Sequence, residues 1–279
     1  MMFYISDGYI EELIHEDLQH MDLTTLSMGI EEVPGQITAF PKRGCLLAGV
    51  EEAARIFEKC GAKAEILIPS GTRAEGGESC LIVRGTAGRL HACYKLAQNV
   101  MEYSSGIATR TAAMLEAARA ENPGVHVAVT RKHFPGAKAL SLKAALAGGA
   151  SLHRLGLSDS ILAFDQHRVF TDDFTALIPR MAEAFPEKKI EAEADSPEEA
   201  MSYLRAGTDM VQCERFAPEA LSAFVKEAKS AFPKAVIAAA GGINADNAGE
   251  YAAAGVDILV TSWVYFGKPE DIKMKFSRI

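Results

Sequence analysis

The sequence predicts an α/β fold in which a smaller α+β unit precedes a parallel α/β barrel. From residue 125 onward, short apolar runs alternate with segments of helical periodicity, a rhythm typical of right-handed βαβ units and a parallel sheet. Polar residues or glycines follow these runs, and the carboxyl ends of barrel strands converge on one face. An open, doubly wound sheet is the alternative. It would gather such residues at one switch point, so we favour the barrel.

The composition is that of a globular protein. The chain has 279 residues, 48% of them hydrophobic and 24% charged, with a net charge of −8, so nucleic acid is not an expected partner. No apolar run approaches the ~18 residues of a membrane span, and we expect no signal peptide at the start of the chain. The five cysteines form no C-x-x-C pair, which favours reduced thiols and a cytoplasmic location.

Residues 1 to about 120 have the pattern of the α+β unit. Apolar spacing predicts a first helix, a turn at Asp22-Leu-Thr-Thr25 and a long helix that is interrupted or kinked at Ser104-Ser105-Gly106. The helices are expected at 7–20, 50–60 and 90–119, and the strands at 37–40, 45–50, 64–68 and 81–83.

The barrel strands are predicted from seven apolar runs, most of them separated by helices. The expected strands are 125–129, 151–155, 160–164, 189–194, 209–213, 235–240 and 256–260, and the expected helices include 173–185, 197–206, 217–231 and 245–254.

Two basic pairs lie at the C-terminal ends of the first two expected strands: Arg131-Lys132 and His153-Arg154. Adjacent cations at a strand end repel each other unless an anion lies between them, so the pattern predicts a multiply charged, phosphorylated ligand. A solvated loop is the alternative for either pair alone. Lys132 could in principle form a Schiff base, but such a lysine is usually desolvated and neutral, whereas this one has cationic neighbours.

Two carboxylates, Glu193 and Glu214, end later strands. Beside basic residues they suit sugar hydroxyls and a Mg²⁺ ion carried in by a polyphosphate; surface salt bridges are the alternative. Gly241-Gly242 ends the next strand and is expected to open a helix, where backbone N–H groups can approach a phosphate. A plain tight turn is equally consistent with it. Thr261-Ser262 ends the last strand, which makes Ser262 a further binding candidate.

The chain carries none of the motifs of rival chemistries. It has no G-x-x-x-x-G-K-[ST], G-x-S-x-G, H-E-x-x-H or G-x-G-x-x-G segment.

Six ordered blocks resemble the quinolinate phosphoribosyltransferase family, also called nicotinate-nucleotide pyrophosphorylases. They are Glu16-Asp17 with Asp22-Leu-Thr-Thr25, Ser105-Gly-Ile-Ala-Thr109, Thr130-Arg-Lys-His-Phe-Pro-Gly136, His153-Arg-Leu-Gly-Leu157, Glu191-Ala-Glu193 and Gly241-Gly-Ile243. The resemblance implies the type II phosphoribosyltransferase fold, with an N-terminal α/β sandwich domain (1–105), an incomplete, seven-stranded-like α/β barrel (106–265) and a C-terminal tail (266–279) that returns to the first domain. It also implies a homodimer with a shared active site.

By the same resemblance, five residues match active-site positions of the family: Arg131, Lys132, His153, Arg154 and Glu193. Three positions depart from it. The family's intersubunit arginine is Lys95 here, the lysine of its Lys-Asp-Asn-His block is Phe164, and the aspartate of its Leu-Asp-Asn block is Glu214. These changes are similar to those of the ModD proteins, described as pyrophosphorylases associated with molybdenum transport.

The resemblance therefore implies transfer of ribose 5-phosphate from phosphoribosyl pyrophosphate, with Mg²⁺, to a ring nitrogen of an altered, less anionic heterocycle. Lys132, Glu193 and Glu214 would be catalytic. The substrate-binding residues would be Lys95, Arg131, His153, Arg154, Phe164, Gly241, Gly242 and Ser262. Phe164 removes a cation and offers an apolar face, and Lys95 lacks the bidentate fork of an arginine. The alternatives are true quinolinate phosphoribosylation with loss of CO₂, and a non-catalytic binder of phosphoribosyl ligands. The sequence names no acceptor and shows no molybdate site separate from the phosphate cluster.

Overall fold

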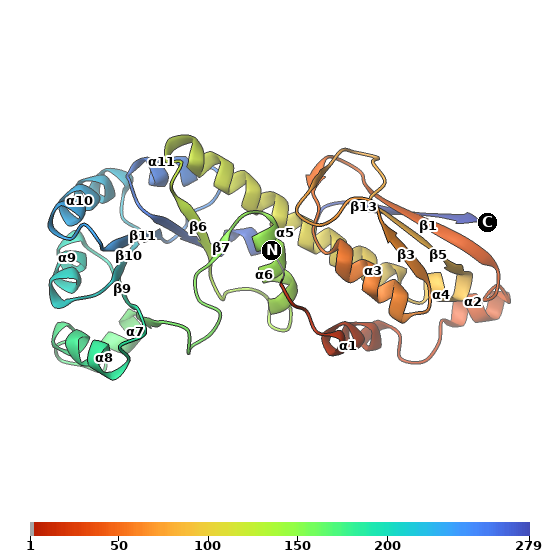
Figure 1. The fold of residues 1–279 in the computed structure, drawn as a ribbon, viewed down its shortest axis with the longest axis horizontal. Helices are drawn as coiled ribbons and strands as arrows, with labels where there is room; N and C mark the ends of the chain where they lie inside the picture. The colour runs from red at the N-terminus through yellow and green to blue at the C-terminus, as the bar shows by residue number, and fades with distance from the viewer. Residues whose placement is uncertain (1–2) are drawn as a thin grey trace. The chain divides into compact units, whose positions relative to one another are not determined.

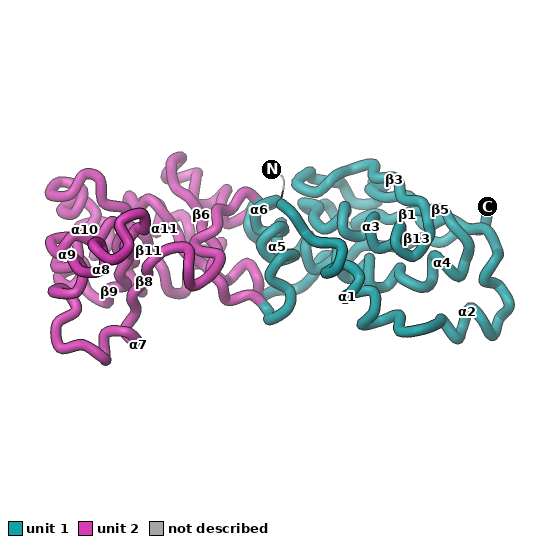
Figure 2. The backbone as a smooth tube through the Cα atoms, turned by 60° about the horizontal axis from the view of Figure 1, so that its bottom comes forward, with its two compact units in different colours: residues 1–112, 134–148, 266–279 teal, residues 113–133, 149–265 magenta. Residues whose placement is uncertain are grey.

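The computed structural model describes residues 3–279, which form two compact units (Figure 2). Of the described residues, unit 1 comprises 3–112, 134–148 and 266–279, and unit 2 comprises 113–133 and 149–265. These units differ from the domain ranges expected from the sequence, because residues 106–112 and 134–148, expected in the barrel domain, pack within unit 1. Those ranges stay a prediction.

Unit 1 is built on a four-stranded antiparallel sheet in the order β13-β1-β5-β3 (Figure 1). Alternate residues of β1 are buried, which places Ile37 and Ala39 in a core with Phe57 and Leu81. The strands of unit 1 are β1 (Pro34–Pro41), β2 (Cys45–Leu46), β3 (Lys63–Ile66), β4 (Arg73–Ala74), β5 (Leu81–Thr86) and β13 (Ile272–Arg278). Its helices are α1 (Asp7–Asp17), α2 (Leu23–Met28), α3 (Val50–Lys59), α4 (Ala87–His91) and α6 (Lys138–Ala147), and α5 (Tyr94–Glu121) begins in this unit.

Two local predictions for this unit are wrong. Helix α5 runs through Ser104-Ser105-Gly106 without a break, because the Ser105 hydroxyl is buried and satisfied by Ala48: it accepts from the Ala48 N–H at 3.0 Å and lies 3.2 Å from the Ala48 carbonyl. The segment expected to be a turn at Asp22 instead starts α2, since the Asp22 carboxylate accepts a hydrogen bond from Thr24 N–H at 3.0 Å and caps the helix.

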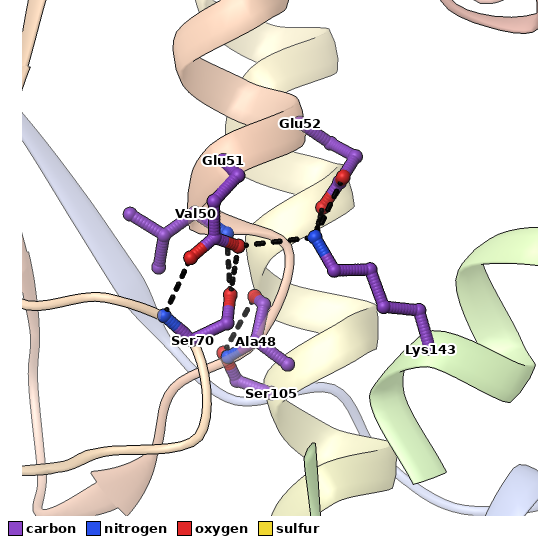
Figure 3. Close-up of polar contacts among 7 residues, drawn as sticks. All are labelled: Ala48, Val50, Glu51, Glu52, Ser70, Ser105 and Lys143. Carbon is purple, nitrogen blue, oxygen red and sulfur yellow. Dashed lines mark hydrogen bonds and ion pairs between the residues drawn. The ribbon is translucent and has the colours of Figure 1, made fainter. Parts of the chain in front are cut away.

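A partly buried ion cluster joins α3, α6 and the segment that contains Ser70 within unit 1 (Figure 3). Lys143 Nζ lies 2.8 Å from a carboxylate oxygen of Glu52 and 3.2 Å from one of Glu51. Glu51 also accepts from the Ser70 N–H at 2.9 Å and from the Ser70 hydroxyl at 2.5 Å. The Glu52 side chain is only 3% exposed, so Lys143 supplies the cation that a buried carboxylate requires.

Unit 2 contains a seven-stranded, entirely parallel sheet in the order β7-β6-β12-β11-β10-β9-β8 (Figure 1). Read around the sheet, neighbours are consecutive in sequence except at the β12–β6 pair. This is the circular order of a barrel, with a gap between β7 and β8. The predicted incomplete barrel is therefore confirmed, and the open doubly wound alternative is excluded.

The barrel strands and helices follow the predicted alternation. The strands are β6 (His126–Val129), β7 (Ser151–Leu152), β8 (Ile161–Ala163), β9 (Ile190–Ala194), β10 (Met210–Glu214), β11 (Val236–Ala240) and β12 (Ile258–Thr261). The helices are α7 (Asp165–Arg168), η1 (Thr175–Leu177), α8 (Ile178–Ala184), α9 (Pro197–Ala206), α10 (Pro218–Ala231), α11 (Ala248–Ala253) and η2 (Trp263–Tyr265). Nowhere along residues 3–279 is there a helix with the length and apolar character needed to cross a membrane.

Candidate functional site

The loop after β6 carries two exposed cations on an anchored backbone. Thr130 N–H donates to the Thr261 carbonyl at 3.0 Å, and the Tyr265 hydroxyl donates to the Thr130 carbonyl at 3.0 Å. The Thr130 hydroxyl in turn accepts from Lys132 N–H at 3.1 Å. The backbone on either side of Arg131 is thus held by neighbouring groups, while the side chains of Arg131 and Lys132 face solvent.

The second basic pair divides into two different environments. His153 Nε2 lies 3.1 Å from a carboxylate oxygen of buried Glu191, so its ring is committed to that partner. Arg154 is half-buried, and burial lowers the pKa of its guanidinium, with the positive charge of Arg131 lowering it further. The two guanidinium groups therefore repel each other. An anion between them would relieve that repulsion.

Glu191, which contacts His153, was not among the site residues predicted from the sequence. Because side chains two residues apart on a strand point to the same side of the sheet, Glu191 and Glu193 on β9 share a face. Alternation within the Glu-Ala-Glu segment was the signal that could have identified it.

Phe164, at the start of α7, contacts the candidate residue Arg154 and its near neighbour in the chain, His167. The Arg154 guanidinium is 5.6 Å from the Phe164 ring centroid. The His167 ring is stacked against Phe164 with centroids 5.8 Å apart and planes 20° apart, and the Phe164 N–H donates to His167 Nδ1 at 3.1 Å. The aromatic face expected to receive an acceptor is thus already flanked by a cation and an imidazole.

Glu193 and Glu214 lie close enough to interact electrostatically. Burial raises the pKa of Glu193, and the negative charge of Glu214 raises it further. Gln212, another residue absent from the sequence-based candidates, donates from Nε2 to Glu193 at 2.6 Å. No cluster of three or more His, Cys, Asp or Glu side chains suited to a metal ion occurs within residues 3–279. Glu193 and Glu214 could supply oxygen donors to a Mg²⁺ ion bound to phosphates, because such an ion needs only one or two protein carboxylates.

Gly241 and Gly242 both have positive φ angles, 92° and 78°. A Cβ atom on Gly241 would lie 2.4 Å from Arg215 Cγ and 2.7 Å from Glu214 Oε1, whereas one on Gly242 would meet nothing within 4 Å. Gly241 is therefore required by packing, and Gly242 leaves open space beside its backbone. The helix begins later than expected, at Ala248, but its N-cap residue Asn247 donates from Nδ2 to the Gly242 carbonyl at 3.2 Å.

Ser262 and Lys95 complete the candidates. Ser262 is partly buried, and its carbonyl accepts from Tyr265 N–H at 3.0 Å. Lys95 is exposed on α5 in unit 1, with Nζ 2.8 Å from Gln98 Oε1 and 5.1 Å from the Tyr94 ring centroid. The structure thus places Lys95 in unit 1 and every other candidate in unit 2.

Comparison with known proteins agrees with this arrangement. Residues 22–105 match the family model for "Quinolinate phosphoribosyl transferase, N-terminal domain", and residues 107–275 match the one for its C-terminal domain. A protein of Rhodobacter capsulatus named "Putative pyrophosphorylase ModD" is 43% identical over 88% of this chain and 96% of its own. The nicotinate-nucleotide pyrophosphorylase [carboxylating] of Rattus norvegicus is 30% identical over 88% of this chain and 82% of its own.

The fold agrees as well. A crystal structure of nicotinate-nucleotide pyrophosphorylase from Ehrlichia chaffeensis superimposes with a TM-score of 0.92, covering 99% of this chain and 100% of that one at 21% identity. The chain belongs to the quinolinate phosphoribosyltransferase family, whose members are pentosyltransferases, and within it the chain is similar to ModD.

Proposed function

We propose that this protein transfers the 5-phosphoribosyl group of phosphoribosyl pyrophosphate to a ring nitrogen of a heterocycle that carries less negative charge than quinolinate. The observation that carries the proposal is the pairing of Arg154 with Phe164. Where the resemblance leads us to expect a lysine, this chain has an aromatic ring. A dicarboxylate acceptor would therefore meet one cation fewer, and an unpaired buried carboxylate costs several kcal/mol.

In the transfer, the bond from the anomeric carbon to the pyrophosphate oxygen breaks and a bond from that carbon to the acceptor nitrogen forms. Pyrophosphate leaves with the electron pair. Arg131, Lys132 and Arg154 would hold the anionic groups. Glu193 would stabilise the positive charge that develops on the sugar ring, and Gln212 supports Glu193 in this role by its 2.6 Å hydrogen bond.

We further propose that Mg²⁺ enters with the pyrophosphate group. Glu193 and Glu214 would complete its coordination, because a Mg²⁺ ion bound to phosphates needs only one or two protein carboxylates. The ion would neutralise negative charge on the leaving group. The raised pKa of Glu193 beside Glu214 supports this assignment, since a cation between two carboxylates removes their repulsion.

A homodimer with a shared active site is part of the proposal, with Lys95 of one subunit serving the barrel of the other. The exposed position of Lys95 on α5 supports it. A cytoplasmic location is also proposed, because all five cysteines are free thiols, as is usual in a reducing compartment.

There are two alternative functions. Family membership and the rat relative support true quinolinate phosphoribosylation with loss of CO₂. A binder of phosphoribosyl ligands without turnover would use the same cations.

A pyrophosphate-release screen with phosphoribosyl pyrophosphate, Mg²⁺ and a panel of pyridine, purine and pterin acceptors tests the proposal. We expect turnover with an acceptor other than quinolinate, and its loss in Lys132→Ala. Preferred turnover of quinolinate with release of CO₂ would favour the first alternative. Calorimetric binding of phosphoribosyl pyrophosphate without release in any reaction would favour the second.

A further inference from the structure

Arg168, the last residue of α7, is an unusual arginine for a protein surface because its side chain is only 11% exposed. Its guanidinium is hydrogen-bonded and ion-paired to the Asp165 carboxylate at the start of the same helix. It also lies 5.6 Å from the ring centroid of Tyr203. One face of the Arg168 guanidinium thus packs on the Tyr203 ring, and its N–H groups can donate to neighbouring oxygens.

The same guanidinium reaches the end of the next strand. Arg168 Nη1 donates to the backbone carbonyl of Glu193, and Nη2 lies 3.5 Å from the Asp195 carboxylate and 3.7 Å from that of Glu199. The Glu199 carboxylate also accepts a hydrogen bond from Asp195 N–H at 2.8 Å. A planar guanidinium carries five N–H donors in fixed positions and can stack on an aromatic ring, whereas a lysine ammonium has three donors and no planar face.

These contacts connect two strand ends that carry different parts of the candidate site. Phe164 follows β8 and caps α7, and Glu193 lies near the end of β9. β8 and β9 are adjacent and parallel, with Ala163 opposite Ala192. We infer that Arg168 is a positioning residue, which fixes the backbone of Glu193 relative to the Phe164 turn and so aligns the charge-stabilising carboxylate with the acceptor end of the site.

This role rests on the proposed function. Arg168 touches no substrate in it, and acts through Glu193 and Phe164. A displaced carboxylate would still leave the phosphate-binding cations in place, because Arg131, Lys132 and Arg154 follow other strands. Loss of Arg168 should therefore lower kcat and leave the KM for phosphoribosyl pyrophosphate nearly unchanged.

Hydrogen–deuterium exchange on the full-length protein tests whether Arg168 holds the two strand ends together. The variants are Arg168→Met and Arg168→Lys. The control is Arg180→Met, which alters an exposed arginine on α8. We expect faster exchange in Arg168→Met at 163–168 and 193–196, with β11 unchanged, and a smaller effect in Arg168→Lys. Unchanged exchange in both segments overturns the inference, whether or not the protein proves to be a transferase.

The functional part is tested by a double-mutant cycle with the acceptor that turns over in the screen. Arg168→Met should lower kcat about tenfold or more, because misplaced catalytic groups are costly. In the Glu193→Gln background the same change should lower it less than about threefold, since residues that act as a unit are not additive. Equal losses in both backgrounds would show a merely structural role and overturn the inference. Absence of wild-type turnover would instead refute the proposed function, and the exchange result would still decide whether Arg168 holds the two segments.

Discussion

The guanidinium of Arg154 lies over the ring of Phe164, 5.6 Å from its centroid. This relationship joins a residue that the family resemblance assigns to anion binding with the residue that departs most from the family pattern. A cation–π contact of this kind is worth about 0.5–2 kcal/mol and orients the arginine without adding charge. Arg154, which follows β7, therefore supplies a positive charge beside the aromatic ring of Phe164, which follows β8.

Acceptor choice should depend on residue 164. The wild-type protein should bind quinolinate weakly, and Phe164→Lys should strengthen that binding by up to about thirtyfold, because pairing a buried carboxylate is worth ~2 kcal/mol. Repulsion by Arg154 would reduce this gain. Calorimetry with quinolinate in the absence of phosphoribosyl pyrophosphate measures it. Met28→Lys is the control, since Met28 is 63% exposed on α2 of unit 1. Tight wild-type binding that the substitution leaves unaltered would support true quinolinate phosphoribosylation instead.

Arg131→Ala should weaken binding of phosphoribosyl pyrophosphate with Mg²⁺. Loss of a charge-assisted contact that becomes desolvated on ligand binding costs ~2–5 kcal/mol. The effect of Arg131 on the pKa of Arg154 indicates that both guanidinium groups act in one region. Arg205→Ala, at an exposed position in the last turn of α9, is the control. Equal affinity of the wild type and Arg131→Ala would place the phosphate site elsewhere.

Mixing Lys95→Ala with Lys132→Ala should restore some activity if each active site takes Lys95 from a partner subunit. Each variant alone should be nearly inactive, and a hybrid dimer would contain one site with both lysines. Pyrophosphate release measured after subunit exchange tests this. Exchange that is demonstrated by mass-labelled subunits, yet yields no activity, would contradict the shared site.

Lys143→Met should destabilise the protein. It leaves the Glu52 carboxylate, 3% exposed, without its cation, and an uncompensated buried charge costs about 3–5 kcal/mol. We expect a lower urea midpoint, partly restored in Lys143→Met/Glu52→Gln. Lys63→Met, at an exposed position on β3, is the control. A double variant no more stable than Lys143→Met would show that packing of the lysine stem, rather than charge, matters here.

The Glu51 contacts should make part of the stability depend on pH. Burial by itself raises the pKa of Glu51, but hydrogen bonds from Ser70 and the charge of Lys143 outweigh it and lower the pKa below the ordinary value of 4.5. The stabilisation is therefore complete above about 4.5 and is lost as the pH falls through the lowered folded-state pKa. The difference in Tm between the wild type and Glu51→Gln should narrow below pH 4.5. A constant difference down to pH 3 would refute this.

The sequence by itself determined the barrel and the residues that end its strands. Alternating runs with periods of 2 and 3.6 carry that information locally, and convergence of parallel strand ends follows from the fold class. Arg131, Arg154, Glu193 and Glu214 could be selected on these grounds alone.

Only the tertiary structure decided which partner each side chain takes. Three contacts of the candidate site join residues 19 to 38 positions apart in the chain. His153 contacts Glu191, Gln212 donates to the Glu193 carboxylate, and Arg168 donates to the Glu193 carbonyl. The unbroken course of α5 also depends on a distant contact. The Ser105 hydroxyl locally favours a break in the helix, but it accepts a hydrogen bond from Ala48 N–H, 57 residues away in the chain. Such contacts depend on which strands become neighbours and in what register, and no local pattern of residues specifies that.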